Sequence, residues 1–266
     1  MEALNFRNDI RMLNILNEAK YNLSNMALDI LYIFIANIKI DDKEFKQYEI
    51  RISELEKRIG RKLNRDSLKK AATELSDTVI DFNNEDINNI KWFEKFELNS
   101  SLGTIEAKIN NELHVYLLDL PNKFTLGYLD SLLSLKSGYA KRIYLLMCQY
   151  SGMAKRKISV EDLNNILNTP ESFKHSVGNF KLKILDPAIA DIKKYSDLKI
   201  FVQEIKYGRA ITHFVFKVNG SKKKTNSLNS NSSVKKKNIE SNKAGVSAAE
   251  KWLQEHNKND SIELNS

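Results

Sequence analysis

The pattern of residues 173–218 restricts the fold of this chain more than any other stretch does. Over residues 180–192, large apolar side chains recur every three or four positions, which predicts a helix with one buried face. Two runs rich in β-branched and aromatic residues follow, at 198–205 and 210–218. Between them, Gly208 can take the positive φ that a tight turn requires. The stretch is therefore predicted to form a helix followed by a β-hairpin.

A proline interrupts this predicted helix. Pro187 has no backbone N–H, and its ring collides with the carbonyl four residues earlier in a regular helix. Either the helix kinks at this point, or Asp186 and Pro187 begin a second segment. In the second case Lys181 and Lys183 lie on a separate turn, and the direction in which they point changes.

The same order of elements is predicted earlier in the chain. In both places an apolar helix is followed by a short strand, a short helix, a helix with a basic outer face and a hairpin. The first copy spans residues 24–109 and the second spans residues 137–218. A unit that occurs twice in the same order is typical of tandem domains, and this order is that of a helix-turn-helix with a β-wing. We therefore predict an α+β protein with two tandem winged-helix domains.

Composition and these patterns set the expected boundaries. Residues 1–23 are predicted to be a polar N-terminal arm, residues 24–135 the first winged-helix domain and residues 136–218 the second. Residues 219–266 are predicted to be a disordered basic tail. Their first part, residues 219–243, holds seven lysines, one acidic residue and few large apolar side chains, too little apolar surface to order itself.

Two uses of the tail remain open. Its lysine clusters either bind DNA through phosphates or belong to a solvated linker. Beyond them, a short amphipathic helix around Trp252 is predicted to dock on a partner or on the body of the protein, because it is too short to be stable alone.

Helix ends are predicted from capping residues. A Ser or Asn side chain before an apolar run can accept a hydrogen bond from a free N–H of the first turn, and an acidic residue three positions later can complete a capping box. Gly60 is expected to end a helix. The predicted N-caps are Ser24, Asn64, Ser137, Ser53 with Glu56, and Ser159 with Asp162.

Two groups of apolar residues have alternative interpretations. The helix after Ser24 is apolar over most of its circumference, so it is expected either to be buried or to face another subunit with one half. Trp92, Phe93 and Phe96 lie in a predicted strand beside two helices, where core packing is favoured over stacking on bases. Cys148 is expected to be a small buried apolar residue.

Charge and motifs restrict the function. The chain has 266 residues and a formal net charge of +8, which favours a polyanionic partner without requiring one. The sequence has no signal peptide and no apolar run of membrane-spanning length, and its single cysteine fits the cytoplasm. We therefore predict a cytoplasmic protein with no membrane partner.

Catalytic motifs are not found in the sequence. It contains no Walker A loop, H-E-x-x-H or G-x-S-x-G. The four histidines are too scattered to form the pair that a metal-dependent nicking enzyme needs; they are His114, His175, His213 and His256. We therefore predict no catalytic residues, no metal site and no cofactor.

Three strings in the second half carry a resemblance to a known family. SGYAKRIYLLMCQY, FKLKILDPAIADIKKYSDL and FVQEIKYGRAITHFVFKV resemble the plasmid replication initiator (Rep) family of the iteron-binding type, whose members have two winged-helix domains. The resemblance extends from about residue 15 to residue 218. The first unit matches the family in its pattern of elements more than in residue identity.

The resemblance implies which residues contact DNA. In such initiators the second winged helix inserts its basic helix into the major groove of repeated origin sites, and its wing lies near phosphates or the minor groove. The helix residues implied here are Lys174, His175, Asn179, Lys181 and Lys183. The wing residues implied are Lys206, Tyr207 and Arg209. The resemblance also implies that the first domain adds DNA contacts. The outward basic residues of its helix after Asn64, which would make them, are Arg65, Lys69 and Lys70.

The resemblance also implies partners. It predicts double-stranded DNA, as direct repeats at an origin and as an inverted repeat at an operator where a dimer represses its own gene. It further predicts a homodimer formed by the first domain, which suits the apolar helix after Ser24, and recruitment of a host replication initiator or helicase machinery. Two alternatives remain: a winged-helix transcriptional repressor without an origin role, and a rolling-circle DNA-nicking enzyme.

Overall fold

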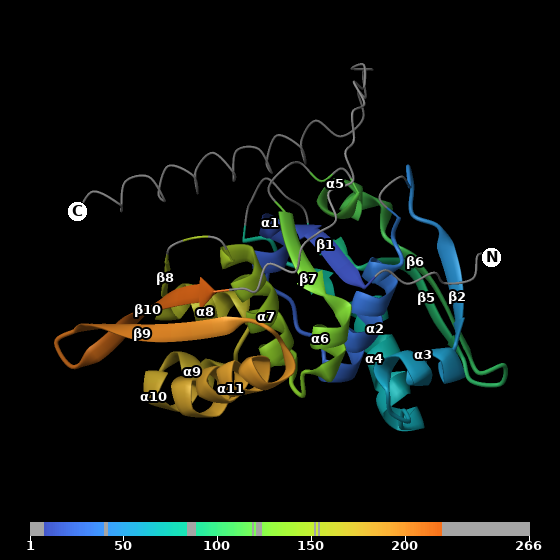
Figure 1. Ribbon diagram of the computed structural model, residues 1–266. Coiled ribbons are helices and arrows are strands. Elements are labelled where there is room, and N and C mark those ends of the chain that lie inside the picture. The colour runs from blue at the N-terminus through green and yellow to red at the C-terminus, as the bar shows by residue number, and fades with distance from the viewer. Residues whose placement is uncertain are drawn as a thin grey trace, which may run out of the picture. The chain divides into compact units, whose positions relative to one another are not determined.

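The two predicted winged helices are both present in the structure (Figure 1). The structure is a computed structural model, and it describes residues 8–39, 42–83, 89–118, 120, 124–151, 153 and 155–219. The predicted tail, apart from Asn219, lies outside the described residues, as do its lysine clusters and Trp252.

The first winged helix has the predicted order of elements. The elements are α2 (Asn25–Ala36), β2 (Gln47–Arg51), α3 (Ile52–Ile59), α4 (Arg65–Asp77), β5 (Phe93–Asn99) and β6 (Thr104–Ile109). The strands form an antiparallel three-stranded sheet in the order β2-β6-β5. Helix α4 packs on β5, so the helices and the sheet share one core.

The second winged helix repeats this topology. Its elements are α7 (Gly138–Tyr150), β8 (Arg156–Ser159), α8 (Val160–Ile166), α9 (Glu171–Lys174), α10 (Val177–Phe180), the π-helical turn η2 (Lys181–Leu185), α11 (Asp186–Tyr195), β9 (Lys199–Tyr207) and β10 (Ala210–Asn219). The sheet has the order β8-β10-β9, in which the first strand again pairs with the last strand of the hairpin. The predicted internal repeat is therefore confirmed.

The expected N-terminal arm is wrong over residues 9–18. Strand β1 (Asp9–Leu13) pairs antiparallel with β7 (Phe124–Tyr128), and α1 (Asn14–Glu18) follows it directly. Ile10 and Met12 point into the core and are fully buried. Because the strand is only five residues long and contains Asp9 and Arg11, its alternation is too short to stand out from a polar segment.

Strand β7 packs closely on α7. A Cβ atom added to Gly127 would lie 2.6 Å from Cδ2 of Leu145, so any larger residue would have to displace this buried side chain.

The remaining short elements complete the first half of the chain. They are β3 (Val79–Ile80), β4 (Ile90–Lys91), η1 (Asn111–Leu113), α5 (His114–Leu117) and α6 (Leu129–Ser134).

Most predicted helix caps are confirmed. The side chains of Ser24, Asn64, Ser137 and Ser159 each accept a hydrogen bond from the first turn of their helices, and Gly60 ends α3 with a φ of 80°. The capping box at Ser53 is wrong, because α3 already begins at Ile52. The Glu56 carboxylate instead accepts hydrogen bonds from the Leu63 N–H at 2.9 Å and from Lys62 Nζ at 2.7 Å.

The apolar helix α2 is buried within this chain. All residues from Ala27 to Ala36 are buried, and α2 contacts β1, α4, α6 and α7. Of the two alternatives for this helix, burial is therefore confirmed and a subunit interface on one half is wrong, since neighbouring elements of the same chain already cover it. The aromatic residues Trp92, Phe93 and Phe96 are buried as well, as the core interpretation predicted. Trp92 packs edge-on against Tyr21 at 5.1 Å between ring centroids.

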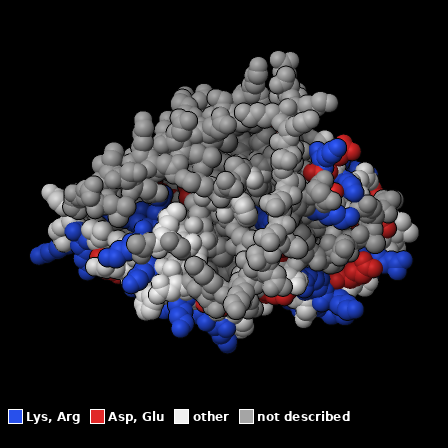
Figure 2. All heavy atoms as spheres, turned by 45° about the horizontal axis from the view of Figure 1, so that its top comes forward, with Lys and Arg blue, Asp and Glu red and all other residues white. Residues whose placement is uncertain are grey.

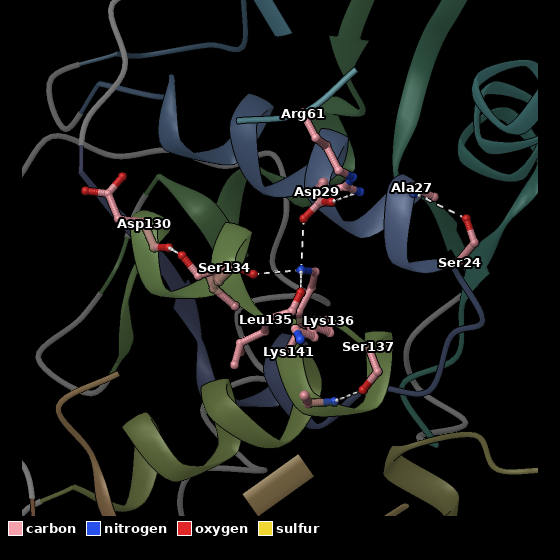
Figure 3. A network of polar contacts seen from close by, with 12 residues as sticks. Ser24, Ala27, Asp29, Arg61, Asp130, Ser134, Leu135, Lys136, Ser137 and Lys141 are labelled. Atoms are coloured by element: carbon pink, nitrogen blue, oxygen red, sulfur yellow. Dashed lines mark hydrogen bonds and ion pairs between the residues drawn. The ribbon is translucent and has the colours of Figure 1, made fainter. Parts of the chain in front are cut away.

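A buried ion pair joins the first helices of the two winged helices (Figure 3). Asp29 on α2 and Lys141 on α7 approach to 2.9 Å, and both side chains are 0% exposed. Lys141 Nζ also donates hydrogen bonds to the carbonyls of Leu132 and Leu135, each at 2.7 Å. Arg61 holds the second carboxylate oxygen of Asp29 at 3.0 Å. Burial raises the pKa of Asp29 and lowers the pKa of Lys141, and their mutual attraction opposes both shifts.

Helix α7 is shared by the two halves of the fold. It contacts α1, α2 and β7 on one side and η2, α11 and β10 on the other. Arg142, which follows Lys141 on α7, donates hydrogen bonds to the carbonyls of Ala19 at 2.6 Å and Ile166 at 2.8 Å. The guanidinium lies 3.8 Å from the ring centroid of Tyr21. Residues before α2 and a residue of the second winged helix thus fix the orientation of α7.

Within the described ranges, no helix has the length and apolarity needed to span a membrane.

Candidate nucleic-acid interface

The helix that the family resemblance predicts to enter the major groove is continuous. It consists of α10, η2 and α11, and is called the recognition helix below. Asp186 N–H bonds to the carbonyl of Lys181, five residues earlier, and the backbone at Leu185 and Asp186 stays helical. This wider π turn accommodates Pro187, which has no N–H and needs room near the preceding turn. Lys181 and Lys183 therefore lie on the same helix as α11.

The burial pattern defines the outward face of the recognition helix. Phe180, Ile184, Leu185, Ala188 and Ile192 are buried against the rest of the domain. Asn179, Leu182, Lys183 and Asp186 are exposed and recur at helical spacing on the opposite side. A helix that packs with one apolar face and presents the other to solvent is able to enter a major groove.

Lys181 differs from its neighbour Lys183. Lys181 Nζ lies 3.0 Å from the Asp186 carboxylate and 3.6 Å from that of Glu204 on β9. The Asp186 carboxylate, with a smaller contribution from Glu204, raises the pKa of Lys181. Glu204 is also 3.6 Å from Lys206, so one acidic residue connects the recognition helix to the wing. Lys183 is exposed and forms no ion pair with any residue that the structure describes.

Lys174 and His175 lie outside the recognition helix. Lys174 ends α9 and His175 follows it as the cap. Both contact Glu171, Lys174 at 3.0 Å and the His175 ring at 3.3 Å. The structure therefore places these two predicted contacts on a preceding short helix, and only Asn179, Lys181 and Lys183 on the recognition helix itself.

The wing of the second domain is the long hairpin of β9 and β10. Tyr207 pairs with Ala210 across the two-residue turn, and Gly208 has the predicted positive φ, at 60°. Tyr207 is 85% exposed, and Lys206 and Arg209 are exposed beside it. In Figure 2, Lys and Arg side chains project around this hairpin, on the left of the view, with few acidic side chains among them.

The first domain presents a similar but more mixed surface. Arg65, Lys69 and Lys70 are exposed on α4, as predicted. A hollow of about 390 Å³ lies between α3, α4 and the β5–β6 turn, and both Arg65 and Lys69 line it. Leu102, 72% exposed, stands at that turn. On the right of Figure 2, positive and negative side chains lie next to one another.

Two contributors to this interface were not predicted from the sequence. Glu204 is a single acidic residue in an otherwise basic hairpin, and its contact with Lys181 depends on how the hairpin packs on the helix. Leu182 is an exposed apolar residue between two lysines, whereas Phe180 and Ile184 near it belong to the core. The periodicity of the sequence contains a signal for Leu182, because it falls outside the buried stripe.

The fold and these surfaces define a tandem winged-helix protein in which each repeat has a helix with exposed basic side chains, and the second repeat also has a basic wing. The comparison with known protein families agrees with this class of protein and identifies one family within it. Residues 9–148 match the family described as "Initiator Replication protein, WH1", and residues 159–218 match "Initiator Rep protein, WH2". The chain belongs to this family of replication initiators, as the resemblance indicated. The first match extends through most of α7, in keeping with the contacts of that helix to both halves.

The comparisons with individual proteins gave the following similarities. An uncharacterized 27.6 kDa protein from Escherichia coli is 24% identical, over 74% of this chain and 90% of that protein. A crystal structure of the Pi initiator protein in complex with iteron DNA has a TM-score of 0.66 and 24% identity, and covers 82% of this chain and 99% of that one. A structure of domains 2 and 3 of RctB has a TM-score of 0.43 and 10% identity, with coverages of 83% and 94%.

Proposed function

We propose that this protein initiates replication of a plasmid by binding repeated sites at its origin through both winged helices. Membership in the initiator family is the observation that carries the proposal. The similar Pi initiator protein forms a crystalline complex with iteron DNA. The exposed face of the recognition helix and the basic hairpin beside it supply the two surfaces that a winged helix uses on duplex DNA.

In this proposal the two domains have different tasks. The second winged helix, expected at residues 136–218, reads the bases through Asn179 and Lys183. Its wing contacts the backbone through Lys206, Tyr207 and Arg209. The first winged helix contributes accessory phosphate contacts through Arg65, Lys69 and Lys70. Exposed lysines and arginines on both domains support a strong electrostatic component, which makes affinity depend on salt concentration.

The proposal includes partners beyond the origin. We infer that a homodimer binds an inverted repeat at the operator and represses the protein's own gene, and that the origin-bound protein opens adjacent duplex and recruits host replication proteins in the cytoplasm. Because α2 is covered within the chain, a dimer has to use another surface of the first domain. We propose no nicking activity and no cofactor, in keeping with the DNA-binding character of the family.

A replication assay tests the proposal. A plasmid that depends on this gene and its flanking DNA is expected to replicate in a suitable host, and Lys183→Ala is expected to abolish or strongly reduce its copy number. Losing one good base contact costs about 1–3 kcal/mol, or roughly 5- to 150-fold in affinity. Lys91→Ala is the matched control, since Lys91 is an exposed lysine on β4.

The outcomes separate the alternatives. Replication that persists with Lys183→Ala contradicts the assignment of this residue, and a plasmid that never replicates with the wild-type gene contradicts the initiator function. Binding to a single inverted repeat without origin activity points to a repressor. Site-specific nicking of supercoiled origin DNA in the presence of a divalent metal points to the nicking enzyme.

A further inference from the structure

The outward face of the recognition helix carries an apolar side chain at its centre. Leu182 is 68% exposed, while Phe180 and Ile184 on either side of it are buried. In the described part of the chain, six large apolar side chains are exposed, and three of them lie on surfaces that a winged helix presents to DNA. These three are Leu102, Leu182 and Tyr207.

An exposed leucine is common on protein surfaces and has no meaning alone. Its neighbours give Leu182 its significance. Lys181 is held by Asp186 and Glu204, so its charge is directed toward the protein. Asp186, the fourth exposed residue of this face, is engaged in the same contact, so the side chains that remain available are Asn179, Leu182 and Lys183. The first and last can form hydrogen bonds, whereas Leu182 can form only an apolar contact.

The surface beside Leu182 allows a close approach. Gly178 lies one turn before it, and a Cβ atom added there would have no other atom within 4 Å. No side chain at that position stands between the helix and a groove. The backbone of α10 can therefore come near the base edges, and Leu182 can reach the groove floor despite its short length.

We propose that Leu182 is a specificity-determining residue that covers the C5-methyl group of a thymine in the major groove. Thymine is the only DNA base that presents a methyl group there, and apolar side chains recognise it by contact. The inference rests on the proposed function, because it requires the recognition helix to enter the groove of the repeated site. It adds a base preference that neither the lysines nor the phosphate contacts supply.

Deoxyuridine substitution tests this contact directly, since it removes the thymine methyl group and changes no hydrogen-bonding group. The full-length protein is titrated against a duplex carrying one repeat from the DNA next to its gene, with each thymine replaced in turn by deoxyuridine. For the wild type we expect one or two positions at which affinity falls about fourfold, the value of one buried methyl group. Leu182→Ala is expected to bind the unmodified repeat about tenfold more weakly and to show no further loss at those positions.

A control variant and a control duplex separate the possible failures. Val79→Ala shortens a side chain that is 39% exposed on β3, outside the second winged helix, and is expected to keep the wild-type response to deoxyuridine. The inference is overturned if Leu182→Ala binds as tightly as the wild type, or if deoxyuridine weakens both proteins equally. If the wild type does not distinguish the repeat from a scrambled duplex, the proposed function itself fails.

Discussion

The buried ion pair between Asp29 and Lys141 makes a quantitative prediction about how the two winged helices are joined. In Asp29→Leu, the Lys141 ammonium stays at a site with 0% exposure and loses its carboxylate partner. Breaking a buried ion pair from one side costs about 3–5 kcal/mol. The contact of Arg61 adds little, since its side chain is 43% exposed and a pair of that kind contributes about 0–1 kcal/mol.

This loss is a large part of the total stability. Domains are stable by about 5–15 kcal/mol, and in a domain of 150–250 residues each 1 kcal/mol changes Tm by about 2–4 °C. Asp29→Leu is therefore expected to lower Tm by about 6–20 °C. Urea unfolding followed by circular dichroism measures the free energy, and calorimetry measures Tm.

A double variant separates the ion pair from the packing around it. Asp29→Leu with Lys141→Met replaces both charges by apolar groups, a change that is often neutral or stabilising. We expect it to recover at least half of the stability that Asp29→Leu loses, although the carbonyls of Leu132 and Leu135 lose their donor. The reasoning is refuted if the two substitutions destabilise additively, because an additive result means that the charges do not interact.

Other predictions concern single positions. Glu204→Gln frees Lys206 on the wing and leaves Lys181 with Asp186 as its partner, so nonspecific DNA affinity is expected to rise and the slope of log K against log salt to steepen by up to about 1; an unchanged slope contradicts this. Asn64→Ala removes the cap of α4 and is expected to cost about 1 kcal/mol in urea unfolding. Gly127→Ala forces a Cβ toward Leu145 and is expected to cost about 1–3 kcal/mol, whereas wild-type stability refutes close packing there. Burial raises the pKa of the Cys148 thiol to about 12, so iodoacetamide at pH 8 is expected to label the folded protein far more slowly than the urea-unfolded protein, and equal rates contradict this.

Local patterns predicted the repeated unit because the physical causes are local. The caps at Ser24, Asn64 and Ser137 act on the next turn, and the positive φ at Gly208 depends on the hairpin itself. The apolar stripe of the recognition helix likewise depends only on helical spacing. These elements could therefore be placed from the sequence within a few residues.

Contacts between distant segments could not be predicted in this way. The apolar surface of α2 is the same whether elements of one chain or a second subunit cover it, and only the packed structure decides between them. Lys181 and Lys183 look equivalent in the sequence, yet only the first of these two lysines forms an ion pair with Glu204. At Pro187 the sequence indicated an interruption, but the π turn that absorbs it is one of several possible responses.

The pairing of β1 with β7 affects how the protein is made. The two strands are more than a hundred residues apart, and the ribosome adds about 5–20 residues per second. For roughly 5–20 s of synthesis, the apolar residues Ile10 and Met12 have no partner strand. During that time β1 is an unpaired edge exposed to other nascent chains. Slower initiation of translation is therefore expected to increase the yield of correctly folded protein, because it reduces encounters between unfinished chains.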